Sequence, residues 1–170
     1  MSIEQLTFDD AHAAPRVEVV RSTKRRKTVS AREVDGVIRV SIPASMSRAE
    51  ETRWVDEMVR RLSRRSTSSE IDLEERAARL AGRYGLPTPS SIRWVGNQGS
   101  RWGSCTPVDR TIRISDRMAG FPSWVLDYVI VHELAHLVVA GHDDRFNALV
   151  ARYPKAERAI GFLIAKGIEE

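Results

Sequence analysis

The sequence predicts a small α+β protein with a mainly antiparallel sheet and one buried helix. Three features lead to this class. Apolar and polar residues alternate between residues 17 and 42, as they do in half-buried strands. Two later stretches repeat apolar residues about every four positions, which is typical of amphipathic helices. A third, over residues 123–139, is apolar on almost every side, so we expect it to lie inside the protein.

The length and composition of the chain fit one compact domain. The chain has 170 residues, of which 42% are hydrophobic, and we assign residues 1–170 to a single domain. Residues 1–15 are candidates for disorder. No uncharged stretch exceeds nine residues, whereas a helix that crosses a bilayer needs about 20 mostly apolar ones. The N-terminus also lacks the basic start and apolar core of a signal peptide. We therefore expect a cytoplasmic protein without membrane association.

Residues 16–45 predict a basic β hairpin. The pair Asp35-Gly36 lies between two alternating runs, and this pair favours the two-residue turn of a hairpin. The net charge of +4 comes from this side of the chain, because residues 1–65 carry 14 Lys and Arg against 10 Asp and Glu. The remaining residues carry 13 of each kind.

Four consecutive basic residues make the densest charge in the hairpin region: Lys24, Arg25, Arg26 and Lys27. Such a group could bind phosphate, so nucleic acid is a candidate partner. A solvated strand edge explains the charges more simply, because no aromatic residues alternate with them to stack on bases.

The next stretch predicts an amphipathic helix. Ser47 and Glu50 have the spacing of a capping box, and apolar residues then recur every four positions up to Leu62. The polar residues 64–69 predict a short joint before the following helix.

A second amphipathic helix and three strands are expected after that joint. The helix runs from about Ser69 to Tyr84 and ends at Gly85. Strand signals follow at residues 92–95, 101–105 and 111–115, with turn residues ahead of the last strand.

The apolar helix over residues 123–139 carries His132, Glu133 and His136. Residues four apart on a helix lie about 40° from each other, so the two imidazoles can converge on one ion. Glu133 lies about 100° round from His132 and can reach a water molecule near that ion. The alternative is a pair of core histidines satisfied by hydrogen bonds. We favour the metal because burying these three polar groups without a partner is costly.

A catalytic metal site needs a third protein ligand and an open position for water. The single cysteine, Cys105, excludes a Cys-based zinc finger and an internal disulfide. His142 is the favoured third ligand, because Gly141 can let the chain leave the helix and turn back. Glu157 on the following helix is the competing candidate.

Two motifs occur together in this chain: RWGSCT at residues 101–106 and VIVHELAHLVVAGHDDRF at residues 129–146. In this order and spacing they resemble the YgjP-like metal-dependent hydrolases, relatives of the SprT-like and WLM-type zinc metallopeptidases. The resemblance extends over most of the chain. It implies a small zincin-like domain in which residues 91–170 form the metal-site region.

The resemblance also implies site residues. One zinc ion would be held by His132, His136 and His142, with Glu133 as the general base that acts on a metal-activated water. The chain would then be a zinc metallopeptidase-type hydrolase that acts on a peptide or protein.

The same resemblance implies that residues 101–105 border the active-site cleft. Arg101 and Trp102 are therefore candidates for substrate binding. An ion pair for Arg101 and core packing for Trp102 explain these residues equally well.

Two other functions remain open from the sequence. One is a nucleic-acid-associated protein or protease that uses the basic hairpin. The other is a metal-dependent nucleotide hydrolase, although no phosphate-binding glycine loop supports it.

Overall fold

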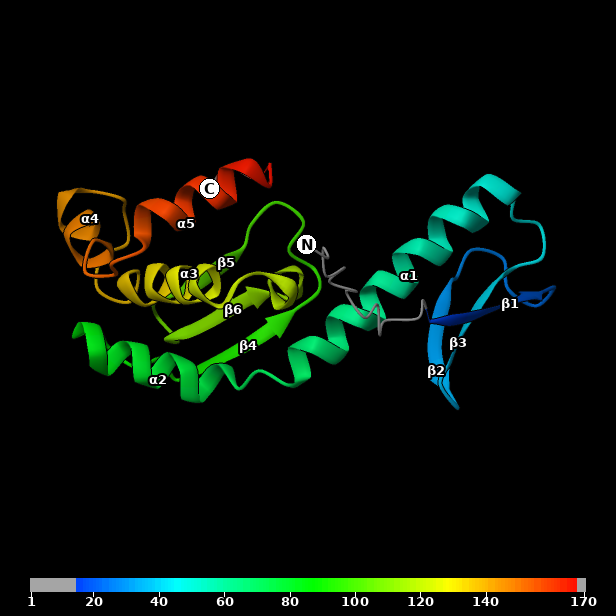
Figure 1. The fold of residues 1–170 in the computed structure, drawn as a ribbon, viewed down its shortest axis with the longest axis horizontal. Coiled ribbons are helices and arrows are strands. Elements are labelled where there is room, and N and C mark those ends of the chain that lie inside the picture. Colours follow the sequence, from blue (N-terminus) through cyan, green and yellow to red (C-terminus); the bar gives the residue numbers. More distant parts are fainter. Residues whose placement is uncertain (1–14, 168–170) are drawn as a thin grey trace, which may run out of the picture. The chain divides into compact units, whose positions relative to one another are not determined.

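The computed structural model describes residues 15–167 and confirms the α+β class (Figure 1). Contacts between residues divide the chain into two compact units, one ending at Leu62 and the other beginning at Ser63. The assignment of residues 1–170 to one domain stays a prediction. The proposed disordered segment, apart from Pro15, lies outside the described residues. Within residues 15–167, no helix combines the length and apolar composition needed to cross a bilayer.

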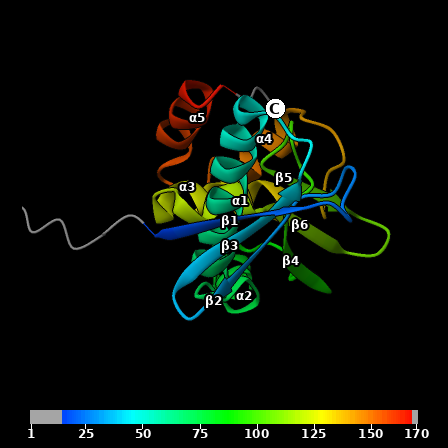
Figure 2. The same cartoon turned by 90° about the vertical axis from the view of Figure 1, so that its right-hand side faces the viewer.

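The first unit contains a mixed three-stranded sheet (Figure 2). Strands β2 (Ser30–Val34) and β3 (Val37–Pro43) form the predicted hairpin. Its turn residues Asp35 and Gly36 both have positive φ angles, 52° and 72°, as a type I′ turn requires. Strand β1 (Arg16–Ser22) pairs with the other edge of β3 in parallel. The region predicted as a hairpin is therefore a hairpin with a parallel third strand.

Helix α1 (Arg48–Ser69) begins where the capping box predicted. The N–H of Ser47 donates to Oε2 of Glu50 at 3.1 Å, and the N–H of Glu50 donates to Oγ of Ser47 at 3.3 Å. In the first unit, the apolar face of α1 packs on the sheet through a small core centred on Val40 and Met58. This cluster gives the N-terminal unit a core of its own.

The predicted joint at residues 64–69 is wrong, because α1 continues through it. The stretch holds no Gly or Pro to end a helix. Its hydroxyl groups bond within the helix instead: Oγ1 of Thr67 donates to the Ser63 carbonyl at 3.1 Å, and Oγ of Ser68 donates to the Arg65 carbonyl at 3.0 Å.

The second unit contains another mixed three-stranded sheet. Strand β6 (Thr111–Ser115) is central, with β4 (Ser91–Val95) parallel on one side and β5 (Gly103–Thr106) antiparallel on the other. The expectation of a mainly antiparallel sheet is thus wrong. In both sheets, the three strands alternate in direction along the chain. The third strand is central, and the first strand pairs with it on the side opposite to the second. This order makes the first and third strands parallel neighbours.

Four α-helices and a short 3₁₀ helix, η1 (Asp116–Gly120), complete the second unit. Helix α2 (Leu73–Tyr84) begins later than predicted, where the side chain of Asp72 caps the N–H of Glu75. Gly85 ends it with φ of 64°, as the sequence indicated. The other helices are α3 (Ser123–Ala135), α4 (Asp144–Val150) and α5 (Ala156–Ala165).

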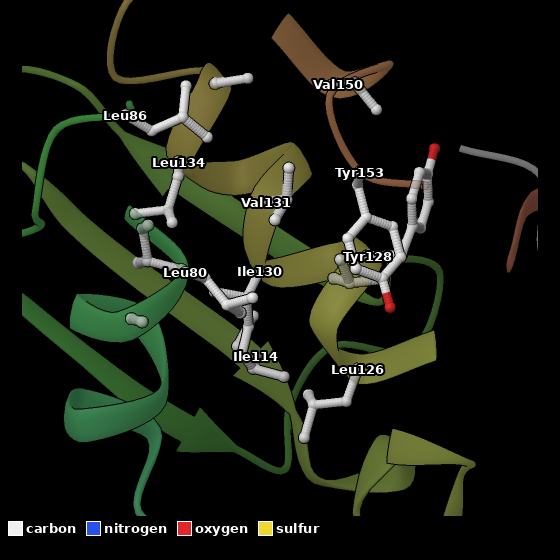
Figure 3. Packing of buried hydrophobic residues seen from close by; sticks show 14 of the residues in the cluster. Leu80, Leu86, Ile114, Leu126, Tyr128, Ile130, Val131, Leu134, Val150 and Tyr153 are labelled. Carbon is white, nitrogen blue, oxygen red and sulfur yellow. The ribbon is translucent and has the colours of Figure 1, made fainter. Parts of the chain in front are cut away.

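Helix α3 forms the centre of the second core, as its apolar composition predicted. It contacts α2, α4, α5 and the strands β5 and β6. Figure 3 shows side chains of this cluster gathered around α3. They include Leu80 from α2, Ile114 from β6, and Leu126, Ile130, Val131 and Leu134 from α3 itself. The burial of α3 on several sides fixes it within the unit.

We expect replacement of a fully buried residue on α3 to lower the free energy of unfolding strongly. Ile130 is 0% exposed, so Ile130→Ala should cost about 2–5 kcal/mol and Ile130→Val about 0.5–1.5 kcal/mol. Urea unfolding followed by circular dichroism measures both. The control is Val108→Ala, at a side chain that is 92% exposed, which should change stability by less than about 0.5 kcal/mol. Equal effects at the two sites would contradict the packing described.

Candidate metal centre

The last turn of α3 carries His132 and Glu133, and the helix ends at Ala135. The sequence predicted its end near Val139. The N–H groups of Val138 and Val139 both bond to the Ala135 carbonyl, at 2.9 and 3.0 Å, and close a tight turn. The chain therefore leaves the helix well before Gly141, the residue to which the sequence analysis attributed this departure.

Three imidazoles meet beside this turn. His132 comes from α3, His136 is the residue that caps its C-terminus, and His142 lies in the loop before α4. The Nε2 atoms of His132 and His136 are 3.2 Å apart, those of His136 and His142 are 3.1 Å apart, and those of His142 and His132 are 3.3 Å apart. Three ring nitrogens thus form a nearly equilateral triangle.

This triangle fits a metal ion. Nitrogen ligands at about 2.0–2.1 Å from a tetrahedral ion lie about 3.3 Å from one another, and three of them leave one position open. Among residues 15–167, the side chains of His, Cys, Asp or Glu that lie close enough together to hold a metal ion are those of His132, His136 and His142. Glu157, the competing third ligand, is exposed on the first turn of α5 and is not part of this group.

Two contacts orient the imidazole of His136. Its Nδ1 lies 3.0 Å from the carbonyl of Val139. Because a carbonyl only accepts hydrogen bonds, Nδ1 carries the proton, and Nε2 keeps a lone pair in the neutral ring. The ring also stacks on Phe146 of α4, with centroids 4.4 Å apart and planes at 27°.

Phe146 contacts the other two imidazoles edge-on. Its ring centroid is 4.9 Å from that of His132 and 4.6 Å from that of His142. The position of Phe146 follows from the N-cap of α4, where the side chain of Asp143 accepts from the Phe146 N–H at 2.9 Å. One capped helix start thus places an aromatic ring against all three histidines.

The surroundings keep the buried imidazoles neutral. Burial, together with the neighbouring His136 and His142, lowers the pKa of His132 to about 3. Burial also lowers the pKa of His136, against an opposite effect of its bond to Val139. Neutral imidazole is the form that ligates metal, so both rings are ready to bind at neutral pH.

The three histidines lie in a cleft of about 600 Å³. Glu133 lines the same cleft and is only 3% exposed. Other parts of the lining come from β5 and the residues around it, including Arg101, Gly103 and Cys105. The arrangement brings a carboxylate, three imidazoles and a strand to one cavity.

Arg101 and Trp102 occupy different environments. The exposed Arg101 lines the cleft. Trp102 is 3% exposed and is not among the lining residues. Its ring packs on Phe121 with centroids 5.0 Å apart, and the Arg117 guanidinium lies 4.4 Å from the ring centroid. These are core contacts, so a direct role of Trp102 in substrate binding stays a prediction.

Cys105 lies in the cleft as a protonated thiol. Burial, with a smaller contribution from the negative charge of Glu133, raises its pKa to about 11. A thiol with this pKa is a poor nucleophile at neutral pH.

Two site residues did not stand out in the sequence. Phe146 looked like an ordinary core residue of the following helix. Gly103 was recognised only as part of the RWGSCT motif, although an isolated Gly within a strand signals a close approach of another group. Knowing which group approaches requires the tertiary structure.

Two comparisons with known proteins found matches to this chain. The family model described as YgjP-like, metallopeptidase domain, matches residues 24–159. No curated protein matches the chain. Among solved structures, the metallopeptidase zymogen of Pyrococcus abyssi abylysin aligns with a TM-score of 0.50 and 19% identity, over 56% of this chain and 95% of that one. The metallopeptidase zymogen of Methanocaldococcus jannaschii jannalysin gives a TM-score of 0.49 and 17% identity, over 58% of this chain and 99% of that one.

The match to abylysin shows a similar fold. The family model covers most of the chain, including every histidine of the cluster. On this basis the chain belongs to the YgjP-like metallopeptidase family.

Proposed function

We propose that this metallopeptidase binds one zinc ion through His132, His136 and His142 and uses Glu133 as its general base. One observation carries the proposal: three Nε2 atoms lie within 3.3 Å of one another in a cleft that Glu133 also lines. A carboxylate next to a three-histidine site is the arrangement that hydrolytic zinc enzymes use.

The donor set favours zinc. Three imidazoles with a fourth position open to the cleft are typical of catalytic zinc sites, whereas Mg²⁺ and Ca²⁺ prefer oxygen ligands. A bound zinc ion would polarise the scissile carbonyl and lower the pKa of water.

Glu133 supplies the proton transfers. It follows the ligand His132 directly on α3, and both side chains line the cleft. The carboxylate would accept a proton from the attacking water and deliver it to the leaving amine, as a general base that then acts as a general acid. Its burial limits the positions that the carboxylate can take.

The substrate that fits best is an extended peptide. In the described sheet β5 is an edge strand, and its residues Gly103, Ser104 and Cys105 line the cleft. A peptide can add to such an edge through main-chain hydrogen bonds and run past the histidines. Arg101 would meet the peptide at the same rim, and a carboxylate of the substrate is its natural partner.

The two other functions gain no support. The family match describes a peptidase domain and gives no reason to prefer nucleotide hydrolysis. Lys24 to Lys27 belong to the connection between β1 and β2, outside both strands. Nucleic-acid binding through them stays a prediction without a supporting observation, as does the cytoplasmic location.

We expect the loss of His142 to weaken zinc binding by about 100-fold or more. Substitution of a residue that only hydrogen-bonds to a metal ligand already lowers metal affinity by about 10–100-fold. His142→Ala should therefore lose the rise in Tm that zinc gives the wild type. Metal content after dialysis and thermal unfolding with and without zinc measure these effects. Glu157→Ala is the matched control and should keep both. If Glu157→Ala loses zinc while His142→Ala keeps it, the ligand assignment is wrong.

Glu133→Gln should retain zinc and lose peptidase activity. Gln preserves the shape of the side chain but cannot take a proton, so kcat should fall by about 10²–10⁴-fold. Steady-state cleavage of a quenched fluorescent peptide library, with metal content measured in parallel, gives the result. The exposed Glu157→Gln variant should behave as the wild type. Unchanged kcat in zinc-loaded Glu133→Gln would eliminate Glu133 as the base.

A further inference from the structure

The backbone of β5 passes very close to the carboxylate of Glu133 at Gly103. Helix α3 packs against β5, and Glu133 lies in the last turn of α3, facing the cleft that both elements line. A Cβ atom added to Gly103 would lie 2.5 Å from Oε1 of Glu133 and 2.9 Å from its Cδ and Cγ. No side chain fits between the strand and the glutamate as they stand.

The backbone conformation does not explain this glycine. The positive φ angles of described glycines occur at Gly36, Gly85 and Gly167. Gly103 has an ordinary strand conformation that any residue could adopt, and it pairs with Ile114 of β6 in regular register. The space required by Glu133 is therefore the reason for a glycine at this position.

The pattern of the neighbouring residues agrees with this explanation. Side chains alternate between the two faces of a strand, so Gly103 and Cys105 share one face and Ser104 takes the other. The charge of Glu133 affects the thiol of Cys105. Ser104 accepts a hydrogen bond of 2.6 Å from Nε2 of Gln98, in the preceding loop. On one face of the strand, Gly103 therefore presents no side chain to Glu133. On the other face, the hydrogen bond of Ser104 to Gln98 holds the strand in place.

We propose that Gly103 is a positioning residue for the peptidase reaction, whose missing side chain sets the place of the Glu133 carboxylate beside the three histidines. This inference rests on the proposed function of Glu133 as the base. Because Cγ, Cδ and Oε1 would all be too close to a Cβ, the glutamate or the strand must move when one is added. The three atoms nearest to this Cβ all belong to Glu133, so we expect the variant to keep its metal binding.

Gly103→Ala tests the proposal. A displacement of about 1 Å at a reacting group can cost about 10²-fold in rate. We therefore expect kcat to fall by about 10²-fold, while KM stays within about twofold and one zinc ion stays bound. The matched control is Gly99→Ala, because a Cβ there meets nothing within 4 Å and Gly99 does not line the cleft. This control should keep the wild-type kcat. Unchanged kcat in Gly103→Ala would overturn the proposal.

A double-mutant cycle separates positioning of Glu133 from obstruction of the substrate. In a Glu133→Gln background the base is already absent, so adding Gly103→Ala should change the remaining activity by less than about threefold. If Gly103→Ala costs the same factor in both backgrounds, or acts mainly by raising KM, Gly103 does not act through the glutamate. A different result would contradict the proposed role of Glu133 as the base, namely full activity of the Glu133→Gln single variant.

Stability gives a readout independent of activity, and it applies even if Gly103→Ala folds poorly. If the alanine clashes with the glutamate, shortening the glutamate relieves the clash. The double variant Gly103→Ala with Glu133→Ala should then have the Tm of Glu133→Ala alone, within about 2 °C, while Gly103→Ala in the wild-type background has a lower Tm. An equal loss of Tm from Gly103→Ala in both backgrounds would contradict the contact on which the proposal depends.

Discussion

The burial of α3 is the constraint on which the site depends. The helix is enclosed by α2, α4, α5 and two strands, so its position in the unit is fixed by apolar packing on several sides. His132 and Glu133 lie on its last turn, at 7% and 3% exposure. A polar pair on such a rigid helix has few positions available to it. The hydrophobic core thus supplies the precision that catalysis at a metal centre needs.

The third histidine depends on local geometry at two helix ends. The turn after Ala135 redirects the chain, and the carbonyl of Val139 orients the ring of His136. The Asp143 cap then starts α4 directly after His142, which brings Phe146 against the three imidazoles. These contacts order the ligand rings by hydrogen bonding and aromatic packing. Such preorganisation reduces the conformational entropy lost when an ion binds.

The cleft combines groups that burial affects in opposite ways. Burial keeps His132 and His136 neutral by lowering their pKa, and it keeps Cys105 protonated by raising the pKa of its thiol. At neutral pH the imidazoles can therefore donate lone pairs, while the protonated thiol is a poor nucleophile. The close approach of β5 at Gly103 adds a steric limit on Glu133. Electrostatics and packing thus both act on the groups that line the cleft.

Local patterns in the sequence determined the features that depend on neighbouring residues. The Asp35-Gly36 turn, the capping box at Ser47, the end of α2 at Gly85 and the burial of α3 all follow from such patterns. Helical spacing likewise indicated the pairing of His132 and His136. Only the tertiary structure decided the parallel strand pairs, the core position of Trp102 and the contact between Gly103 and Glu133. It also brings His142, which the sequence favoured over Glu157, to the other two histidines. These features join residues from separate elements, and strand order and interhelical packing leave no periodic signal in the sequence.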